Sequence, residues 1–260
     1  MIGNVKNLFD LTGKVALITG GGQGLGESIA QGFAQYGAAT SIVDINPETA
    51  AGVAEGINAA GGKAIAVQCD VSKEEQARAA VAETLEEFGK IDILAAVAGI
   101  GDRNSAEEMA IEQWDRVIAI NLTGVWLFDQ EVGKHMIERG EGGCIINMAS
   151  IGGQVAVPTG NANYCASKGG VIALTRVLAV EWARFNIRVN ALAPVQFRTP
   201  LIANLIERKP EVLDYFLGKI PLGRIGEVRE IVGPAIFLAS DASSMVTGAV
   251  LNVDGGRTAS

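Results

Sequence analysis

Residues 19–26 read Thr19-Gly20-Gly21-Gly22-Gln23-Gly24-Leu25-Gly26, and the segments on either side indicate how this part of the chain folds. The apolar run at residues 15–18 predicts a buried strand, and apolar residues at helical spacing after the glycines, at Ile29 and Phe33, predict a helix. Glycines also serve plain tight turns. Between a strand and a helix, however, they let the backbone approach a pyrophosphate, and the first N–H groups of the helix favour an anion.

The rest of the chain repeats this alternation of strand and helix. Six further short apolar runs lie at residues 41–43, 64–67, 91–95, 144–148, 187–192 and 250–253. Their continuous apolar character is typical of strands that are buried on both faces, and the segments between them are long enough for crossover helices. The sequence therefore predicts a doubly wound α/β fold, with a mostly parallel seven-stranded sheet and helices on both faces.

The composition indicates one compact domain. The chain has 260 residues, of which 48% are apolar and 19% charged, and it contains no Pro-rich or Ser-rich linker and no repeat. We expect a single domain over residues 1–260. An irregular stretch between Pro194 and Pro200 leads into apolar patterns at residues 201–206 and 212–217. We interpret residues 195–220 as a small helical lid.

The charge balance and the cysteines exclude several classes of protein. Lys and Arg total 21 against 29 Asp and Glu, so the net charge of -8 offers no basic face for nucleic acid. No run of ~18 apolar residues predicts a membrane span, and residues 1–12 lack the apolar run of a signal peptide. Cys69, Cys144 and Cys165 are too far apart to predict a disulfide framework or a zinc site. We expect a cytoplasmic protein.

Asp44 strengthens the interpretation of the glycine turn. It ends the second predicted strand 18 residues after Gly26, where a dinucleotide-binding fold places the acid that hydrogen-bonds the adenosine ribose. A carboxylate at this position repels a 2'-phosphate, and the following residues, Ile45 and Asn46, carry no positive charge to pair with one. The sequence therefore predicts NAD rather than NADP. The alternative is that Asp44 only caps the loop before Asn46 and Pro47.

A second candidate site lies in the helix predicted after residue 163. Tyr164 and Lys168 are four residues apart, so they project from the same helix face. An adjacent ammonium favours the phenolate, so we expect Lys168 to lower the pKa of Tyr164 from about 10 towards the range of a general acid/base. The alternative is an ordinary surface pair, which the spacing alone does not distinguish.

Taken together, these features resemble the short-chain dehydrogenase/reductase family over residues 12–256. The resemblance implies a Rossmann fold and rests on motifs at both ends of the chain. The family's Thr-Gly-x-x-x-Gly-x-Gly turn matches residues 19–26, and its Tyr-x-x-x-Lys pair matches Tyr164 and Lys168. Further matches are Ser150 after the fifth strand, Asn121 in Asn121-Leu122-Thr123-Gly124, Asp70-Val71, and Val253-Asp254-Gly255-Gly256.

The resemblance also implies roles for these residues. Tyr164 transfers the proton, Ser150 holds and polarises the substrate oxygen, Lys168 binds the nicotinamide ribose and tunes Tyr164, and Asn121 supports a water-linked proton relay. Such hydroxyl donors stabilise the negative charge that hydride transfer develops on oxygen, and no metal is needed. The expected NAD-binding residues are Gly20, Gln23, Gly24, Leu25, Gly26, Asp44, Asp70, Val71, Ala98, Gly99, Tyr164, Lys168 and Thr199.

The sequence departs from the family pattern in three places. The family's Asn-Asn-Ala-Gly is here Ala96-Val97-Ala98-Gly99, so the polar support of the two asparagines is missing. The usual Pro-Gly after the sixth strand is Pro194-Val195. Ser150 and Tyr164 are 14 residues apart where 13 is more usual, which predicts one extra residue in the loop at residues 158–163, beside the substrate.

The residues expected around the substrate are polar. They fall at residues 101–104, 161–163 and 196–198 and at Gln154. Such side chains suit a hydroxyl-rich or anionic ligand better than an apolar one, and Arg103 and Arg198 are candidate partners for a carboxylate. The alternative is that the arginines are solvated or pair with Asp102 or Glu107. We predict substrate contacts at Ser150, Gln154, Asn161, Tyr164 and Arg198.

The C-terminal half, including Pro221-Leu222-Gly223-Arg224 and Phe237-Leu238-Ala239-Ser240, resembles family members that act on sugars, sugar acids and polyols. The resemblance thus implies an NAD-dependent dehydrogenase of such an alcohol, assembled as a homotetramer. One alternative is an NADH-dependent ketone reductase for another carbonyl class, such as an oxoacyl, steroid or xenobiotic compound. The other is a dinucleotide-binding regulator without turnover.

Overall fold

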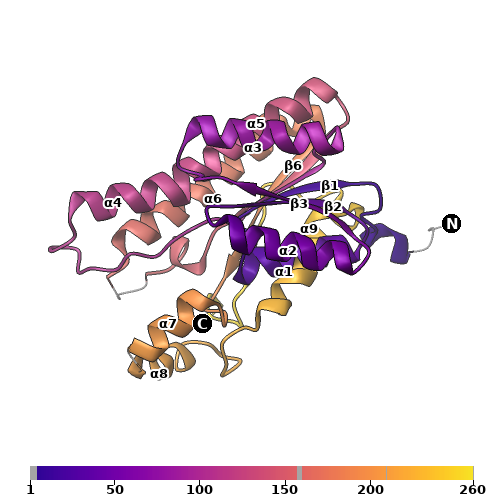
Figure 1. Cartoon of the computed structure of the whole chain (residues 1–260). Coiled ribbons are helices and arrows are strands. Elements are labelled where there is room, and N and C mark those ends of the chain that lie inside the picture. Colours follow the sequence, from indigo (N-terminus) through magenta and orange to yellow (C-terminus); the bar gives the residue numbers. More distant parts are fainter. Residues whose placement is uncertain (1–4, 157–159, 209, 260) are drawn as a thin grey trace.

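The computed structural model describes residues 5–156, 160–208 and 210–259 (Figure 1). Within these residues seven parallel strands form one sheet in the order β3-β2-β1-β4-β5-β6-β7. Every strand predicted from an apolar run is present, with ends that differ by one or two residues. The strands are β1 (Val15–Thr19), β2 (Ala39–Asp44), β3 (Lys63–Gln68), β4 (Ile93–Ala96), β5 (Gly143–Met148), β6 (Ile187–Pro194) and β7 (Val250–Val253).

Helices cover both faces of this sheet, as predicted (Figure 1). On one face α1 (Gly24–Gln35), α2 (Pro47–Ala59) and α9 (Val232–Ala239) bury a core that includes Ile29, Phe33 and Ile236. On the other face α3 (Glu74–Phe88), α5 (Gly124–Arg139) and α6 (Ala162–Trp182) bury a second core that includes Phe128 and Val171. The remaining helices are α4 (Ile111–Ile118), α7 (Pro200–Arg208), α8 (Glu211–Leu217), and 3-10 turns at Val5–Phe9, Ile151–Gly153, Ala183–Phe185, Val228–Ile231 and Asp241–Ser243.

The strand order reverses beside β1, which pairs with β2 on one side and with β4 on the other. The chain leaves β1 and β4 towards opposite faces of the sheet, because α1 covers one face and α5 the other. Such a switch point opens a crevice at the carboxyl ends of parallel strands, where ligands of this fold class bind. One edge of the sheet therefore holds the last residues of β1, β2, β4 and β5, which are Thr19, Asp44, Ala96 and Met148.

A buried polar cluster ties β5 to the two helices that flank the crevice. The side-chain amide of Asn147 on β5 donates to Asp129 Oδ2 on α5 at 2.9 Å and to Thr175 Oγ1 on α6 at 3.2 Å. All three side chains are fully buried. Burial raises the pKa of Asp129 to about 8, against a weaker opposing effect of the Asn147 hydrogen bond. The cluster thus fixes α5 and α6 against the strand that ends next to Ser150.

The irregular segment after β6 contains the two helices predicted for it. Figure 1 shows α7 and α8 lying apart from the sheet, below α1. They share a small core of their own, built on Phe216, Ile220 and Ile225. A bridge between Phe197 and Gly226 joins the start of the segment to its end. This substructure is built on a core separate from the two main cores.

Candidate active site

The glycine turn after β1 has no room for side chains. A Cβ on Gly26 would lie 2.1 Å from the carbonyl oxygen of Gly20, and one on Gly22 would lie 2.4 Å from Thr49 Oγ1. Gly20 and Gly24 also adopt positive φ angles of 65° and 61°, which L side chains rarely adopt. The backbone at the start of α1 can therefore be approached closely by a ligand.

The start of α1 lacks an internal acceptor for its first N–H groups. The helix begins at Gly24, and the side chain of the preceding residue, Gln23, makes no capping hydrogen bond. Uncapped N–H groups and the positive end of the helix dipole together form an anion site. A pyrophosphate fits this cradle in charge and in shape, because the side-chain-free turn leads directly to the donors.

Asp44 closes the next strand and faces the same cradle. Its Oδ2 accepts a hydrogen bond from the N–H of Gly22 at 2.9 Å, and its Oδ1 accepts one from the N–H of Asn46 at 3.0 Å. The bond to Asn46 corresponds to the loop cap that was the alternative interpretation. The bond to Gly22 additionally joins the carboxylate to the glycine turn. Asp44 thus caps the loop and also lines the cavity described next.

A cavity of about 820 Å³ runs along this edge of the sheet, from Asp44 and Asp70 to Tyr164 and Thr199. Its walls bring together residues from six strand ends and from α6 and α7. All residues predicted to bind the dinucleotide line it: Gly20, Gln23, Gly24, Leu25, Gly26, Asp44, Asp70, Val71, Ala98, Gly99, Tyr164, Lys168 and Thr199. An extended dinucleotide could therefore be held by these residues along the cavity.

Ser150 and Tyr164 meet in the wall of this cavity. Ser150 caps the 3-10 turn that follows β5, where its Oγ accepts a hydrogen bond from the N–H of Gly152 at 3.1 Å. The Ser150 hydroxyl acts to lower the pKa of the Tyr164 phenol. The two hydroxyl-bearing side chains thus line the same cavity, although they lie 14 residues apart in the sequence.

The pKa of Tyr164 differs from the expectation. Burial raises the pKa of this phenol, while the Ser150 hydroxyl and the positive charge of Arg103 act to lower it. Lys168 is not among the groups that lower it, so the prediction that its ammonium makes Tyr164 more acidic is wrong for this structure. The physical reason is that desolvation of the phenolate outweighs the favourable contacts.

Lys168 is instead bound to the backbone. Its Nζ donates to the carbonyl oxygen of Met148 at 2.6 Å and lies 5.9 Å from the centre of the Tyr164 ring. The side chain is 2% exposed, and burial lowers the pKa of Lys168 to about 8. The contact with Met148 holds the ammonium of Lys168 at the carboxyl end of β5, next to Gly99. From there it can reach a ligand in the cavity.

Asn121 lies on a π-helical turn, Ala119–Thr123, inserted between α4 and α5. Its Oδ1 accepts from the N–H of Ile100 at 2.8 Å, and its Nδ2 donates to the carbonyl oxygen of Ile100 at 2.9 Å and to Ser167 Oγ at 3.3 Å. The side chain therefore holds the segment after β4 and does not itself line the cavity. Such turns often occur at functional sites, but no sequence signal revealed this one.

Thr19 supplies the polar support that the missing family asparagines would give. Its Oγ1 accepts hydrogen bonds from the N–H groups of Val97 and Ala98, at 3.1 Å and 3.2 Å. Ala98 in turn lies so close to the glycine turn that a Cβ on Gly20 would be 2.8 Å from its Cα. The end of β4 is therefore held by Thr19 on the neighbouring strand, although residues 96–99 lack the family's two asparagines.

Two of the predicted substrate residues lie outside the cavity. Arg198 is exposed and donates from Nε to Glu227 Oε1 at 3.1 Å, because the preceding Phe197 turns into the core and directs Arg198 outward. Gln154 donates to Asn252 Oδ1 at 2.6 Å, because it ends the 3-10 turn that points towards the C-terminal segment. Neither Arg198 nor Gln154, at which substrate contacts are predicted, lines the cavity in this structure.

Of the remaining polar candidates, Asn104 and Asn163 do not line the cavity and the others do, and α7 adds lining residues that the sequence did not reveal. Asn161, Gln196 and Arg103 are in its wall. Asp102, which might have paired with Arg103, instead binds Arg116 and Gln113. The lining residues that were missed come from α7, whose orientation no motif predicts: Ile202, Asn204, Leu205 and Arg208. The extra residue predicted at 158–163 falls partly at residues 157–159, outside the described residues.

Two further features concern the described residues as a whole. No helix among them is both long and apolar enough to span a bilayer. In the same residues no group of three or more His, Cys, Asp or Glu side chains is arranged to hold a metal ion.

Comparisons with known proteins agree with this geometry. A family model described as enoyl-(acyl carrier protein) reductase matches residues 20–258. The D-threitol dehydrogenase of Mycolicibacterium smegmatis is 42% identical over 250 residues, which cover 96% of this chain and 95% of that protein. The gluconate 5-dehydrogenase of Gluconobacter oxydans is 40% identical over 254 residues, 98% of each chain.

A solved structure is similar over the same length. The gluconate 5-dehydrogenase of Burkholderia cenocepacia, crystallised in complex with NADP and tartrate, is 41% identical and superposes with a TM-score of 0.94. The match covers 99% of this chain and all of that one. The fold and the crevice at its carboxyl edge are therefore shared with this enzyme.

Proposed function

This chain belongs to the short-chain dehydrogenase/reductase family, and we propose that it is an NAD-dependent dehydrogenase of a sugar, sugar acid or polyol. The observation that carries the proposal is the pair of hydroxyl side chains, Ser150 and Tyr164, in the wall of a cavity that begins at the glycine turn. A protein that only binds a dinucleotide has no need of this hydroxyl pair. Hydride transfer to or from a CH–OH carbon does need it.

The cavity fits the dinucleotide in chemistry as well as in extent. The uncapped start of α1 suits its pyrophosphate, and the Asp44 carboxylate suits the ribose hydroxyls of the adenosine. By their family positions, Asp70 and Val71 lie at the adenine, Lys168 at the nicotinamide ribose and Thr199 at the carboxamide. When bound, the nicotinamide supplies the hydride acceptor or donor.

Asp44 favours NAD over NADP. Its carboxylate would repel a 2'-phosphate placed at the ribose. The exposed residue that follows, Ile45, also lines the cavity and carries no charge. Gly22 has no room for a basic side chain, because a Cβ there would meet Thr49 and Asp44. The related Burkholderia enzyme was crystallised with NADP, so cofactor preference follows from these side chains and not from the family.

Tyr164 is the proposed general acid/base. During oxidation its deprotonated oxygen takes the hydroxyl proton of the substrate, and during reduction it returns a proton to the carbonyl oxygen. Ser150 holds the same substrate oxygen and stabilises the charge that develops on it. Lys168 keeps its place through Met148, and Asn121 supports the relay by which the proton reaches solvent.

The substrate class is supported by the polar groups in the cavity wall. Gln196, Asn204 and Arg103 offer donors and acceptors that an apolar ligand would leave desolvated without partners. Relatives named for threitol and gluconate act on hydroxyl-rich compounds of this kind. The guanidinium of Arg103 additionally suits a sugar acid.

A second candidate is a reductase for a different carbonyl compound. It is favoured by the apolar side chains of α7, Ile202 and Leu205, which also line the cavity. A panel of sugars, sugar acids, polyols, steroids and acyl thioesters, assayed by NADH absorbance in both directions, distinguishes the two. We expect turnover of hydroxyl-rich alcohols. Activity confined to steroids or acyl thioesters would contradict the proposed function.

The pH dependence of oxidation tests the role of Arg103. Oxidation requires Tyr164 in its deprotonated form, so kcat/KM for a neutral polyol is expected to rise with pH. Arg103 lowers the pKa of Tyr164, and its removal therefore raises that pKa. Arg103→Gln is expected to move the rising part of the profile to higher pH. Arg198→Gln, a matched change outside the cavity, should leave it in place, and equal profiles for Arg103→Gln and the unmodified enzyme would contradict the assignment.

We also propose that the protein is a homotetramer. Apolar side chains are exposed on α5 and α6, where Trp126 is 37%, Val177 52% and Val180 80% exposed. Such a surface favours contact with a second copy. Light scattering is expected to give four times the chain mass of 27.0 kDa, whereas a monomeric mass would contradict the proposal.

A further inference from the structure

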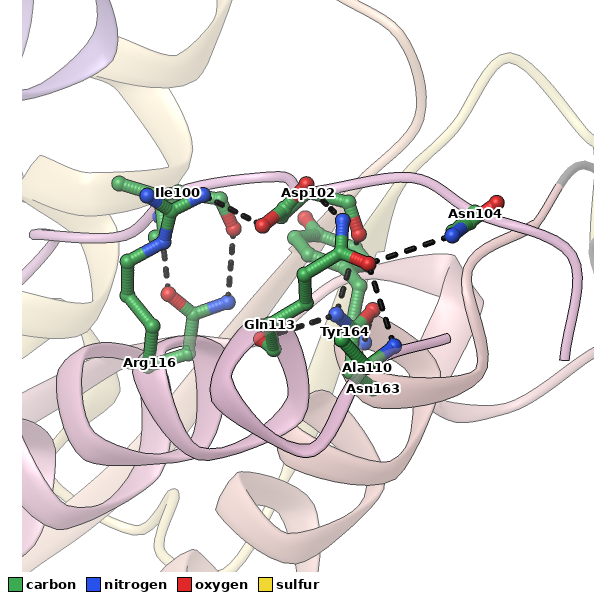
Figure 2. A network of polar contacts seen from close by, with 9 residues as sticks. Ile100, Asp102, Asn104, Ala110, Gln113, Arg116, Asn163 and Tyr164 are labelled. Atoms are coloured by element: carbon green, nitrogen blue, oxygen red, sulfur yellow. Dashed lines mark hydrogen bonds and ion pairs between the residues drawn. The ribbon is translucent and has the colours of Figure 1, made fainter. Parts of the chain in front are cut away.

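A polar network beside the cavity connects three parts of the chain that are distant in sequence (Figure 2). These are residues 100–104, which follow β4 and are called here the β4 loop, the helix α4, and the first turn of α6, which carries Tyr164. Gln113 on α4 and Asn163 on α6 lie at the centre of the network. Neither residue lines the cavity, although Asn163 is among the residues that the sequence predicts around the substrate.

Asn163 joins the first turn of α6 to the other two parts. Its Oδ1 accepts a hydrogen bond from the N–H of Tyr164 at 2.7 Å. Its Nδ2 donates to the carbonyl oxygens of Asp102 at 3.0 Å and of Gln113 at 3.3 Å. The side chain is fully buried, so water cannot readily replace these bonds. The backbone position of Tyr164 is therefore fixed to that of the β4 loop.

Gln113 holds the β4 loop from the other side. Its Nε2 donates to Asp102 Oδ1 at 3.0 Å, and its Oε1 accepts from Asn104 Nδ2 at 3.2 Å and from the N–H of Ala110 at 3.3 Å. Arg116 binds the second oxygen of the Asp102 carboxylate. Figure 2 shows Gln113 lying between the side chains of Asp102 and Asn104. Both amide atoms of Gln113 are thus used.

The loop is held at alternate residues, and Arg103 lies between two of them. Ile100 is bound by Asn121, Asp102 by Gln113 and Asn163, and Asn104 by Gln113 and by the carbonyl oxygen of Gly160 at 3.0 Å. The side chains of Asp102 and Asn104 are bound to Gln113 on α4, whereas Arg103 lines the cavity, where it acts electrostatically on Tyr164.

The network also keeps Arg103 available to a ligand. The nearest carboxylate in sequence, Asp102, is occupied by Gln113 and Arg116. In the part of the chain that the structure describes, no carboxylate forms an ion pair with Arg103. If Asp102 lost its partners on α4, it would be free to compete for the guanidinium next to it.

We infer that Gln113 and Asn163 are positioning residues, which hold Arg103 at a fixed place relative to Tyr164 and thereby set the preference for an anionic over a neutral substrate. The inference rests on the proposed function. It assigns the preference to residues that touch neither the substrate nor the cofactor, and that act through the β4 loop.

An exchange of the carboxylate and the amide between Asp102 and Gln113 tests whether Gln113 positions Arg103. Gln113→Glu keeps the acceptor for Asn104 and Ala110 but sets a carboxylate against Asp102, so the hydrogen bond is lost. Asp102→Asn together with Gln113→Glu restores one hydrogen bond in the opposite direction at the same total charge. Gln31→Glu is the matched control, because Gln31 also donates to a carboxylate, that of Glu27 at 3.1 Å, on exposed α1.

The readout is KM and kcat for a sugar acid and for the polyol of the same chain length. Gln113→Glu is expected to raise KM for the acid about 10-fold, with less than about 3-fold change in kcat for the polyol, and the double variant to return KM to within about 3-fold. The control should change neither. Unchanged kinetics in Gln113→Glu would overturn the inference, as would an equal loss for both substrates that the exchange does not reverse.

Hydrogen exchange gives a readout that does not depend on the substrate. Amide protons of residues 101–105 are expected to exchange faster in Gln113→Glu and at the original rate in the double variant. Exchange that is unchanged in Gln113→Glu would overturn the inference whatever the enzyme acts on. Restored exchange without turnover of any sugar acid or polyol would instead contradict the proposed function. Gln113→Met, which removes all three side-chain hydrogen bonds of Gln113 without adding charge, replaces the single variant if that variant does not fold.

Discussion

Tyr164→Phe is expected to lower kcat for alcohol oxidation by about 1,000-fold or more, within the range that general acid/base catalysis contributes. The change removes only the phenolic oxygen of a residue that lines the cavity together with Ser150. Without that oxygen no group is in place to take the substrate proton, since Lys168 is bound to Met148 O. The aromatic ring and its packing are retained, so NADH affinity is expected to stay within about 3-fold.

The measurement pairs steady-state turnover with NADH binding by fluorescence titration. Tyr36→Phe is the matched control, because Tyr36 is 46% exposed and lies at the end of α1, away from the cavity. It should retain full activity. If Tyr164→Phe kept most of its activity, the assignment of the general acid/base would be incorrect. If it lost NADH binding as well, the residue would serve the cofactor and not the proton.

The second large effect concerns the choice of cofactor. Asp44→Ser combined with Ile45→Arg is expected to shift the ratio of kcat/KM between NAD and NADP by on the order of 100-fold towards NADP. The carboxylate that repels a 2'-phosphate is removed, and a guanidinium is added at a position that is 64% exposed and lines the cavity. The kinetics of both cofactors with one alcohol give the ratio.

Asp44→Asn separates charge from shape in the same experiment. It keeps a side-chain oxygen as acceptor for the N–H of Gly22 or Asn46. We expect it to weaken the preference for NAD without creating a preference for NADP. If the unmodified enzyme already favoured NADP, or if neither variant changed the ratio of kcat/KM between NAD and NADP, then Asp44 would not determine the choice of cofactor.

The fold could be predicted from the sequence because each strand is buried on both faces and therefore appears as a continuous apolar run. β7 (Val250–Val253) was predicted to the residue, while β4 begins at Ile93, two residues after its predicted start at Ile91. The order of the strands, with its reversal beside β1, is instead seen only in the folded chain. The glycine turn and Asp44 were found because their function requires fixed residue types at a fixed distance from strand ends.

Side-chain direction was harder to predict. Arg198 and Gln196 are two residues apart in the same loop, yet only Gln196 lines the cavity, because the burial of Phe197 between them directs its neighbours. The pKa of Tyr164 likewise depends on how deeply the fold buries the phenol, which the Tyr-x-x-x-Lys spacing does not reveal. The network around Gln113 and Asn163 joins residues 50 positions apart, so only the folded chain shows it.

The most direct test is a crystal structure of the protein with NADH. We expect the adenosine ribose at Asp44 and the pyrophosphate at the start of α1. The nicotinamide ring is expected to face the hydroxyl of Tyr164, with Lys168 at the nicotinamide ribose. A dinucleotide bound elsewhere, or a nicotinamide ring directed away from that hydroxyl, would contradict this prediction.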